Sequence, residues 1–233
     1  MNNDVRFKAH EKPLNMYAGI HKGQRLALFQ LSMRACALDN NDRKDFKAFR
    51  NDLSALRDEV REHIKHEETY VHPFLRERVP GAAQDLEDDH RDTERMFDEL
   101  VNDFDCILNK PIEFDKLFEL WLEFYRDLNR FICHYLVHIK KEEEYIQPTL
   151  WFVCTGDELW TALSRILASL SPQEAMQDLS IIIPADNIDG LVELYLVAKD
   201  AISSEGFKAA CDLAQHLLSP TIWNSLKSSI GVE

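Results

Sequence analysis

Glycine and proline are scarce in this sequence, which holds seven and eight of them among 233 residues. Clusters of β-branched residues are also rare, apart from Ile181-Ile182-Ile183, and no long stretch alternates apolar with polar residues. Sheet-rich folds need tight turns, which glycine and proline favour, and strands in which apolar and polar residues alternate. Since 45% of the residues are hydrophobic, the chain can still bury a sizeable core. Together these features predict an all-α protein.

A basic stripe is missing as well. The 41 acidic and 27 basic residues give a net charge of −14, so we expect no nucleic-acid partner. No stretch approaches the ~20 apolar residues that a membrane-spanning helix needs. Residues 1–12 are polar and charged, without the apolar segment of a signal peptide. We therefore expect no membrane partner and a cytoplasmic location.

The cysteines form no CxxC motif, which argues against a zinc–thiolate site. They are odd in number and widely spaced, as is typical of reduced residues in the core of a cytoplasmic protein. They are Cys36, Cys106, Cys133, Cys154 and Cys211.

Apolar residues at helical spacing, separated by polar or proline-containing breaks, predict four long helices in the first two thirds of the chain. These helices cover about residues 13–38, 42–78, 82–108 and 111–152. Because the connections between them are short, we expect an antiparallel up-down-up-down four-helix bundle over residues 13–153.

From residue 154 onwards the pattern changes to shorter helices with caps of their own. Ser171-Pro172-Gln173-Glu174 has the form of a capping box, and Ser219-Pro220 opens another helix. We expect residues 154–233 to form a helical C-terminal extension that packs on the bundle. A dimer contact or a lid over one end of the bundle is the alternative role, so the chain is expected to be a monomer or a homodimer.

Two segments of eleven residues, 63–73 and 138–148, are near copies and agree at seven positions. Each copy begins with a histidine and has a glutamate four residues later, which on an α-helix places both side chains on one face. One such pair can bind a metal ion, and two pairs on facing helices can bind two ions bridged by carboxylates. The repeat therefore predicts a dinuclear metal site.

The expected helix order supports this prediction. In such a bundle the start of the first helix, the end of the second, the start of the third and the end of the fourth lie at one end. Each of these places carries a histidine, and the second and fourth add the repeated glutamates. The candidate metal ligands are His21, His63, Glu67, His90, His138 and Glu142. The simpler alternative is that the pairs are solvated i,i+4 contacts.

This ligand pattern resembles the hemerythrin-like (HHE cation-binding) family. The resemblance covers about residues 16–148, and the tail looks like that of a bacterial branch of the family. It implies a non-haem di-iron centre with two iron ions, oxo- or hydroxo-bridged, inside a four-helix bundle. By this resemblance Glu67 and Glu142 bridge the ions, and the four histidines are terminal ligands.

The family's oxygen-carrying members have a fifth histidine one turn after the histidine of the third helix, where this chain has Glu94. Glu94 is therefore a candidate for an additional ligand. A hard anionic ligand favours the ferric state, so we expect the protein to autoxidise rather than to store oxygen. His72, in contrast, is expected at the surface or in a loop.

The resemblance implies a protein that binds or senses dioxygen, nitric oxide or iron at open coordination positions. One alternative is a di-iron oxidase or peroxidase, and another is a metal-free helical interaction module. A different divalent metal, such as zinc or manganese, can also bind imidazole and carboxylate ligands. The sequence does not separate a binding protein from an enzyme, although we favour the binding protein.

Overall fold

The computed structural model describes residues 14–38, 42–109 and 114–232. Across these ranges all regular elements are helices, so the predicted all-α class is confirmed. No described helix combines enough length with enough apolar character to span a bilayer. The chain divides into two compact units, one of residues 24–144 and one of residues 14–23 with 145–232.

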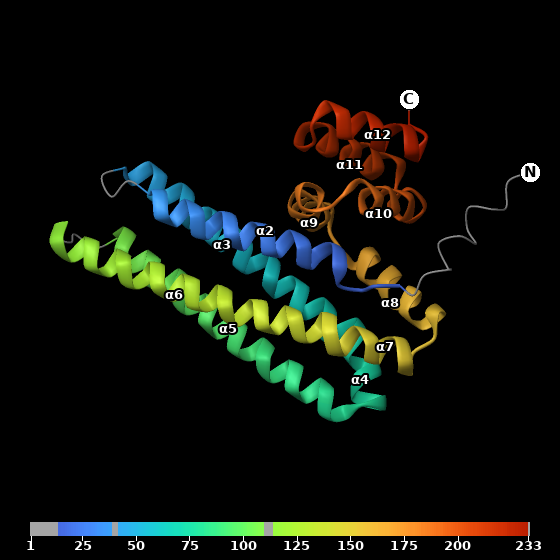
Figure 1. The fold of residues 1–233 in the computed structure, drawn as a ribbon, viewed down its shortest axis with the longest axis horizontal. Helices are drawn as coiled ribbons and strands as arrows, with labels where there is room; N and C mark the ends of the chain where they lie inside the picture. Colours follow the sequence, from blue (N-terminus) through green and yellow to red (C-terminus); the bar gives the residue numbers. More distant parts are fainter. Residues whose placement is uncertain (1–13, 39–41, 110–113, 233) are drawn as a thin grey trace, which may run out of the picture. The chain divides into compact units, whose positions relative to one another are not determined.

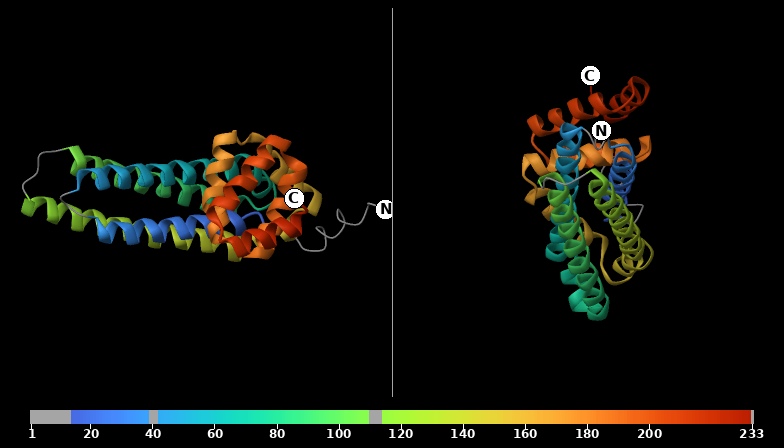
Figure 2. Two further views of the ribbon diagram at one scale, coloured as in Figure 1. Left: turned by 90° about the horizontal axis from the view of Figure 1, so that it is seen from above. Right: turned by 90° about the vertical axis from the view of Figure 1, so that its left-hand side faces the viewer.

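Four long helices make up most of the unit of residues 24–144, and they lie side by side (Figures 1 and 2). They are α2 (Ala18–Ala37), α3 (Arg43–His66), α5 (Pro80–Asn109) and α6 (Phe114–Lys141). Residues 18–23 of α2 belong to the other unit. Asp42 begins α3 as the sequence predicts, because its side chain accepts hydrogen bonds from the backbone amides of Lys44 and Asp45.

Side-chain contacts show that neighbouring helices of this unit run antiparallel. Along α3 the residue numbers rise while those of their partners on α5 fall: Arg50 pairs with Asp105, and Arg61 pairs with Asp98. The same opposite order holds for α5 with α6, in the contacts Phe97–Phe131 and Phe104–Phe124. It holds for α2 with α3, in the contacts Gln24–Glu59 and Arg34–Asp45. It also holds for α2 with α6 and the turn that follows α6, in the contacts Ser32–Asn129 and Arg25–Glu143.

Aromatic side chains fill the core between these helices. Phe49 and Phe104 are fully buried, with ring centroids 5.0 Å apart. Each fully buried side chain of this size stabilises the fold by roughly 1.5–3 kcal/mol. The other aromatic members of this layer are Phe46, Trp121 and Phe124. The candidate ligands His63, His90 and His138 lie on the same three helices, away from this aromatic layer.

The unit of residues 14–23 and 145–232 consists mainly of shorter helices, the last four of which share a second core. They are α7 (Gln147–Val153), α8 (Gly156–Ser169), α9 (Pro172–Ala185), α10 (Ile188–Ala201), α11 (Ser204–Leu217) and α12 (Pro220–Ile230). Ser171 and Glu174 form the predicted capping box, and Ser219 caps α12. Tyr195, Trp223 and Leu226 lie in the core of this unit.

The domain boundary predicted between residues 153 and 154 stays a prediction. The division into compact units falls elsewhere, because the contacts group residues 145–153 with those that follow. The five cysteines are free, as expected, but the prediction that they lie in the core is wrong for Cys36, Cys106 and Cys133, which are exposed.

Candidate metal centre

The helix changes geometry at the glutamate of each copy of the repeat. A π-helical turn, η2, spans Glu67–Val71, and a second one, η3, spans Glu142–Ile146. Such turns insert one residue into an α-helix and occur frequently at functional sites. In η2 the backbone amide of His72 donates to the carbonyl of Glu67, so His72 lies one π-turn beyond that glutamate. The helix predicted over residues 42–78 is therefore present, but this π-helical turn interrupts it between α3 and α4 (His72–Arg78).

Four predicted ligands from three helical segments of one unit meet in a buried cluster. Glu67, His90, His138 and Glu142 each offer one ligand atom, and these atoms lie within 4.8 Å of one another. The Nε2 atom of His90 lies 3.3 Å from Oε2 of Glu67 and 3.7 Å from Oε1 of Glu142. The Nε2 atom of His138 lies 3.4 Å from Oε1 of Glu142. We call these four residues, together with His63, the inner cluster.

His63 joins the inner cluster through Glu67. Its Nε2 atom lies 3.2 Å from Oε1 of Glu67, across the i,i+4 spacing of the repeat. Glu67 thus stands between His63 and His90, which contact different oxygens of its carboxylate. A carboxylate between two imidazoles is the arrangement that a bridging ligand requires.

His21 lies on the part of α2 that belongs to the other unit. The structure therefore does not place it relative to the inner cluster, and its role as a ligand stays a prediction. Gln24, one turn further along α2, belongs to the unit of residues 24–144. Its amide donates to Glu59 over 3.1 Å and accepts from the hydroxyl of Tyr135 over 2.9 Å.

The protonation of the cluster reflects its buried carboxylates. Burial lowers the pKa of His63, but Glu67 and Glu142 more than offset this effect and raise it to about 9. Burial likewise lowers the pKa of His90, while Glu142, Glu67 and Glu68 raise it to about 11. For Glu67, burial favours a higher pKa, but the imidazoles of His63 and His90 bring it well below its ordinary value. Without a metal ion, protons on these imidazoles balance the buried carboxylates.

Several buried ligand atoms make no close, well-aligned hydrogen bond within the described part of the chain, and contact other members of the cluster or Asp89 only at 3.2–3.7 Å. They are both carboxylate oxygens of Glu67, Nε2 of His90 and both ring nitrogens of His138. A buried polar atom without a hydrogen bond costs about 1–3 kcal/mol, so such a group needs an explanation. Imidazole nitrogens and carboxylate oxygens facing one another suit a divalent metal ion. The residues present therefore fit the metal that the repeat predicts.

Further carboxylates lie near the outer ring nitrogens of two histidines. Oε1 of Glu68 lies 3.0 Å from Nδ1 of His90, and Oδ2 of Asp89 lies 3.7 Å from Nδ1 of His138. His138 and Lys141 lower the pKa of Asp89 to about 2, so this carboxylate is charged at neutral pH. Carboxylates in these places orient histidine ligands and raise their basicity.

Glu94 and His72 do not lie where the sequence suggests. Glu94 is partly exposed, and its carboxylate lies 3.3 Å from Nε of Arg61, so the structure does not bring it into the inner cluster. The expectation that His72 is a surface or loop residue is wrong, because its side chain is fully buried. Its ring stacks on that of His90, with centroids 5.1 Å apart and planes at 12°. Burial lowers the pKa of His72, which favours the neutral imidazole.

One signal in the sequence pointed to His72. In the alignment of the two repeat copies its counterpart is Gln147, and a proline follows each of them. Gln147 is also buried, and its side chain accepts from the amide of Met16 over 2.6 Å. A polar residue at the same position of both copies, just before the proline, is a repeated structural feature rather than a loop residue.

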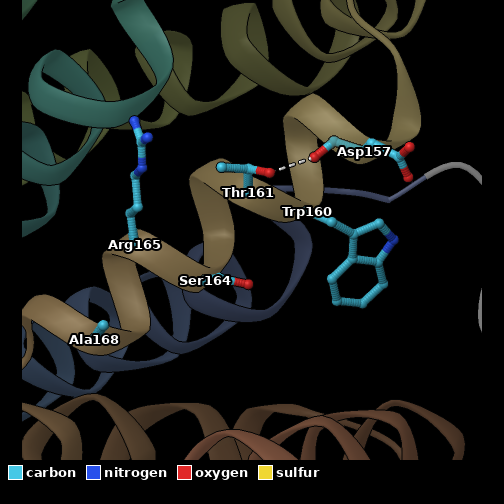
Figure 3. A pocket seen from close by; sticks show the side chains of 6 residues that line it. All are labelled: Asp157, Trp160, Thr161, Ser164, Arg165 and Ala168. Atoms are coloured by element: carbon cyan, nitrogen blue, oxygen red, sulfur yellow. Dashed lines mark hydrogen bonds between the residues drawn. The ribbon is translucent and has the colours of Figure 1, made fainter.

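A groove of about 460 Å³ lies along α8, in the unit that contains the C-terminal helices (Figure 3). Its lining includes Asp157, Trp160 and Arg165, and the hydroxyl of Thr161 donates to the carbonyl of Asp157 over 2.7 Å. The lining contains neither histidine nor cysteine. The groove therefore differs chemically from the inner cluster and offers no comparable set of metal ligands.

Comparison with known proteins agrees with this chemistry. Residues 12–150 match a family model described as the hemerythrin HHE cation binding domain. No curated protein and no solved structure matches the chain.

Proposed function

Since the chain belongs to the hemerythrin HHE cation-binding family, we propose that it holds a non-haem di-iron centre in the inner cluster. The observation that carries this proposal is the burial of Glu67 and Glu142, each beside imidazoles of the cluster. Two carboxylates in one buried place repel each other unless cations compensate them. Two metal ions supply that compensation and use the ligand atoms that lack hydrogen bonds.

In this proposal Glu67 and Glu142 bridge the ions, while His63, His90 and His138 are terminal ligands. Glu68 and Asp89 keep the rings of His90 and His138 in place, because each carboxylate lies near Nδ1 and leaves Nε2 for the metal. The ring orientation is then set before the metal arrives.

We further propose that His21 is the fourth terminal histidine. On the continuous helix α2 it lies three residues before Gln24, which contacts Glu59 and Tyr135. Glu59 lies one turn before His63 on α3, and α2 runs antiparallel to α3. Moving one turn from Gln24 towards the start of α2 therefore moves towards the level of His63.

Four histidines, two bridging carboxylates and one bridging oxo or hydroxo group leave about two of roughly twelve coordination positions open. When bound, the two ions supply these positions for a small ligand such as dioxygen or nitric oxide. The chain contributes buried imidazoles and carboxylates. One helical turn before His138, the hydroxyl of Tyr135 donates a hydrogen bond to the side chain of Gln24. We propose that the protein binds or senses such a ligand, or iron itself.

Iron binding to the full-length metal-free protein tests this function. We expect two ferrous ions per chain in an anaerobic titration, and absorption typical of an oxo bridge after exposure to air. The variant that replaces His63 and His138 together by alanine should take up neither ion tightly. The exposed His216 on α11, replaced by alanine, is the matched control and should bind as the wild type does. A wild-type protein that takes up no iron refutes the proposal and favours a metal-free helical module.

A further inference from the structure

A second group of ligand atoms adjoins the inner cluster. Glu68, His72 and His90 each offer one ligand atom within 4.8 Å of the others. The two groups share His90, whose Nε2 lies near Glu67 and Glu142 and whose Nδ1 lies 3.0 Å from Oε1 of Glu68. One imidazole thus has a ring nitrogen in each group.

His72 indicates that this second group takes a ligand of its own. Its side chain is 0% exposed, yet neither ring nitrogen makes a hydrogen bond within the described residues. The nearby carboxylate of Glu87 has its Oε1 atom 3.7 Å from Nδ1 of His72, too far for a hydrogen bond. The same oxygen already accepts a hydrogen bond from Nε of Arg76 over 2.7 Å. A buried imidazole in this position has a free lone pair and no partner for it, which is the condition of an unfilled metal ligand.

Exposure separates the two groups. The carboxylates of the inner cluster are almost inaccessible, with 4% of the Glu67 side chain and none of the Glu142 side chain exposed. The side chain of Glu68 is 37% exposed. A buried metal site needs a route by which the ion enters. The second group reaches solvent through Glu68 and shares His90 with the inner cluster, so it lies where such a route would run.

We propose that Glu68, His72 and His90 form an outer site for a divalent cation, through which metal ions reach the inner cluster. Two imidazoles and one carboxylate suit Fe²⁺, Zn²⁺, Mn²⁺ or Co²⁺. The ion binds first to Glu68 at the solvent edge, to His72 and to Nδ1 of His90, which releases its proton to solvent. It then leaves these ligands for Glu67 and Glu142, which lie near the other nitrogen of the same ring, Nε2. Three ligands bind it more weakly than the inner cluster does, so it moves inwards. This inference rests on the proposed metal-binding function.

The repeat offers a suitable substitution. The counterpart of His72 in the second copy is Gln147, which is buried in the same position before a proline. Glutamine is therefore a residue that this local geometry accepts, and His72→Gln removes the imidazole while leaving every member of the inner cluster intact. Glu68→Gln is a second variant at a partly exposed position, so it tests the outer site even if His72→Gln does not fold.

The experiment loads the full-length metal-free protein with Co²⁺ under anaerobic conditions. Equilibrium dialysis measures how many ions bind, and stopped-flow absorption measures how fast the inner cluster fills. We expect the wild type to bind one weak ion in addition to its tight ions. His72→Gln and Glu68→Gln should lose that ion and fill the inner cluster at least about tenfold more slowly. His72→Gln should still reach the full number of tight ions.

The exposed His216 again provides the control, since His216→Gln should change neither rate nor stoichiometry. Equal rates and equal stoichiometry in the wild type and both variants overturn the outer site while leaving the proposed function in place. Loss of the tight ions in a folded His72→Gln protein also overturns it, because His72 then belongs to the inner cluster. If the wild type takes up no Co²⁺ and no iron, both proposals fail together.

Discussion

Replacing Glu67 by glutamine tests the electrostatic account of the inner cluster without requiring a metal. The substitution keeps the size of the side chain and removes its charge. In the structure this carboxylate lies 3.2 Å from His63 and 3.3 Å from His90, and its side chain is only 4% exposed. We therefore expect Glu67→Gln to leave two buried imidazolium groups with less compensating charge.

The size of the effect follows from this burial. Removing one partner of a buried ion pair destabilises a protein by about 3–5 kcal/mol. For a chain of this length, each kcal/mol lowers the melting temperature by about 2–4 °C. The metal-free Glu67→Gln protein should therefore melt roughly 6–20 °C below the wild type near pH 6.

The dependence on pH has a definite sign. Glu67 and its neighbours raise the pKa of His63 to about 9 and that of His90 to about 11, from an ordinary value of 6.5. Stability from a raised pKa is fully present below the ordinary value and is lost as the pH rises through the value in the folded protein. The difference between wild type and Glu67→Gln should therefore be largest near pH 6 and should shrink as the pH rises through about 9 and then about 11.

Calorimetric melts of both chelator-treated proteins at several pH values measure this difference. Glu144→Gln is the matched control, because Glu144 is more than half exposed and lies 3.7 Å from Lys140. Exposed substitutions of this kind change stability by about 0.5 kcal/mol or less. If Glu67→Gln melts within a degree or two of the wild type at pH 6, or if the difference grows with pH, the account of the cluster given above is wrong.

Three further predictions concern the metal and the core. Metal binding at pH 7 should release about two protons per chain, because His63 and His90 are charged when no metal is bound. Calorimetry in buffers of different ionisation enthalpy counts the released protons, and a count of zero contradicts this protonation. Asp89→Asn should weaken metal binding about 10–100-fold by freeing the ring of His138; an unchanged affinity in a competition titration would show that Asp89 does not position this ring. Phe49→Ala should cost about 3–5 kcal/mol, since Phe49 is fully buried; denaturant unfolding measures this, and the metal stoichiometry should stay the same.

The long helices could be predicted because their signals are local. Apolar residues at helical spacing, the polar break before residue 43 and the capping box at Ser171 act over a few residues. The structure confirms the capping box and has a helix cap at Asp42, where that break ends. The duplicated His–Glu pairs are local as well, since an i,i+4 spacing already places His63 and Glu67 side by side. Antiparallel order followed from short connections, which allow few other arrangements.

The π-helical turns could not be predicted in this way. An α-turn and a π-turn differ by a single residue in their hydrogen bonding, and local propensities do not distinguish them. The choice depends on what surrounds the segment, and it moves His72 from an expected surface position to a buried one against His90. The same holds for Glu94, since only the approach of α3 to α5 brings Arg61 within 3.3 Å of it.

The amino-acid sequence alone was thus sufficient for the all-α class, the positions of the main helices and the pairing of each repeated histidine with its glutamate, because each depends on neighbours within about one helical turn. The fold decided which carboxylates became buried, which ring nitrogens were left without partners and which third-helix residue stayed outside. Those properties depend on contacts between helices that are far apart in the chain, where solvent is excluded and a lone charge is costly.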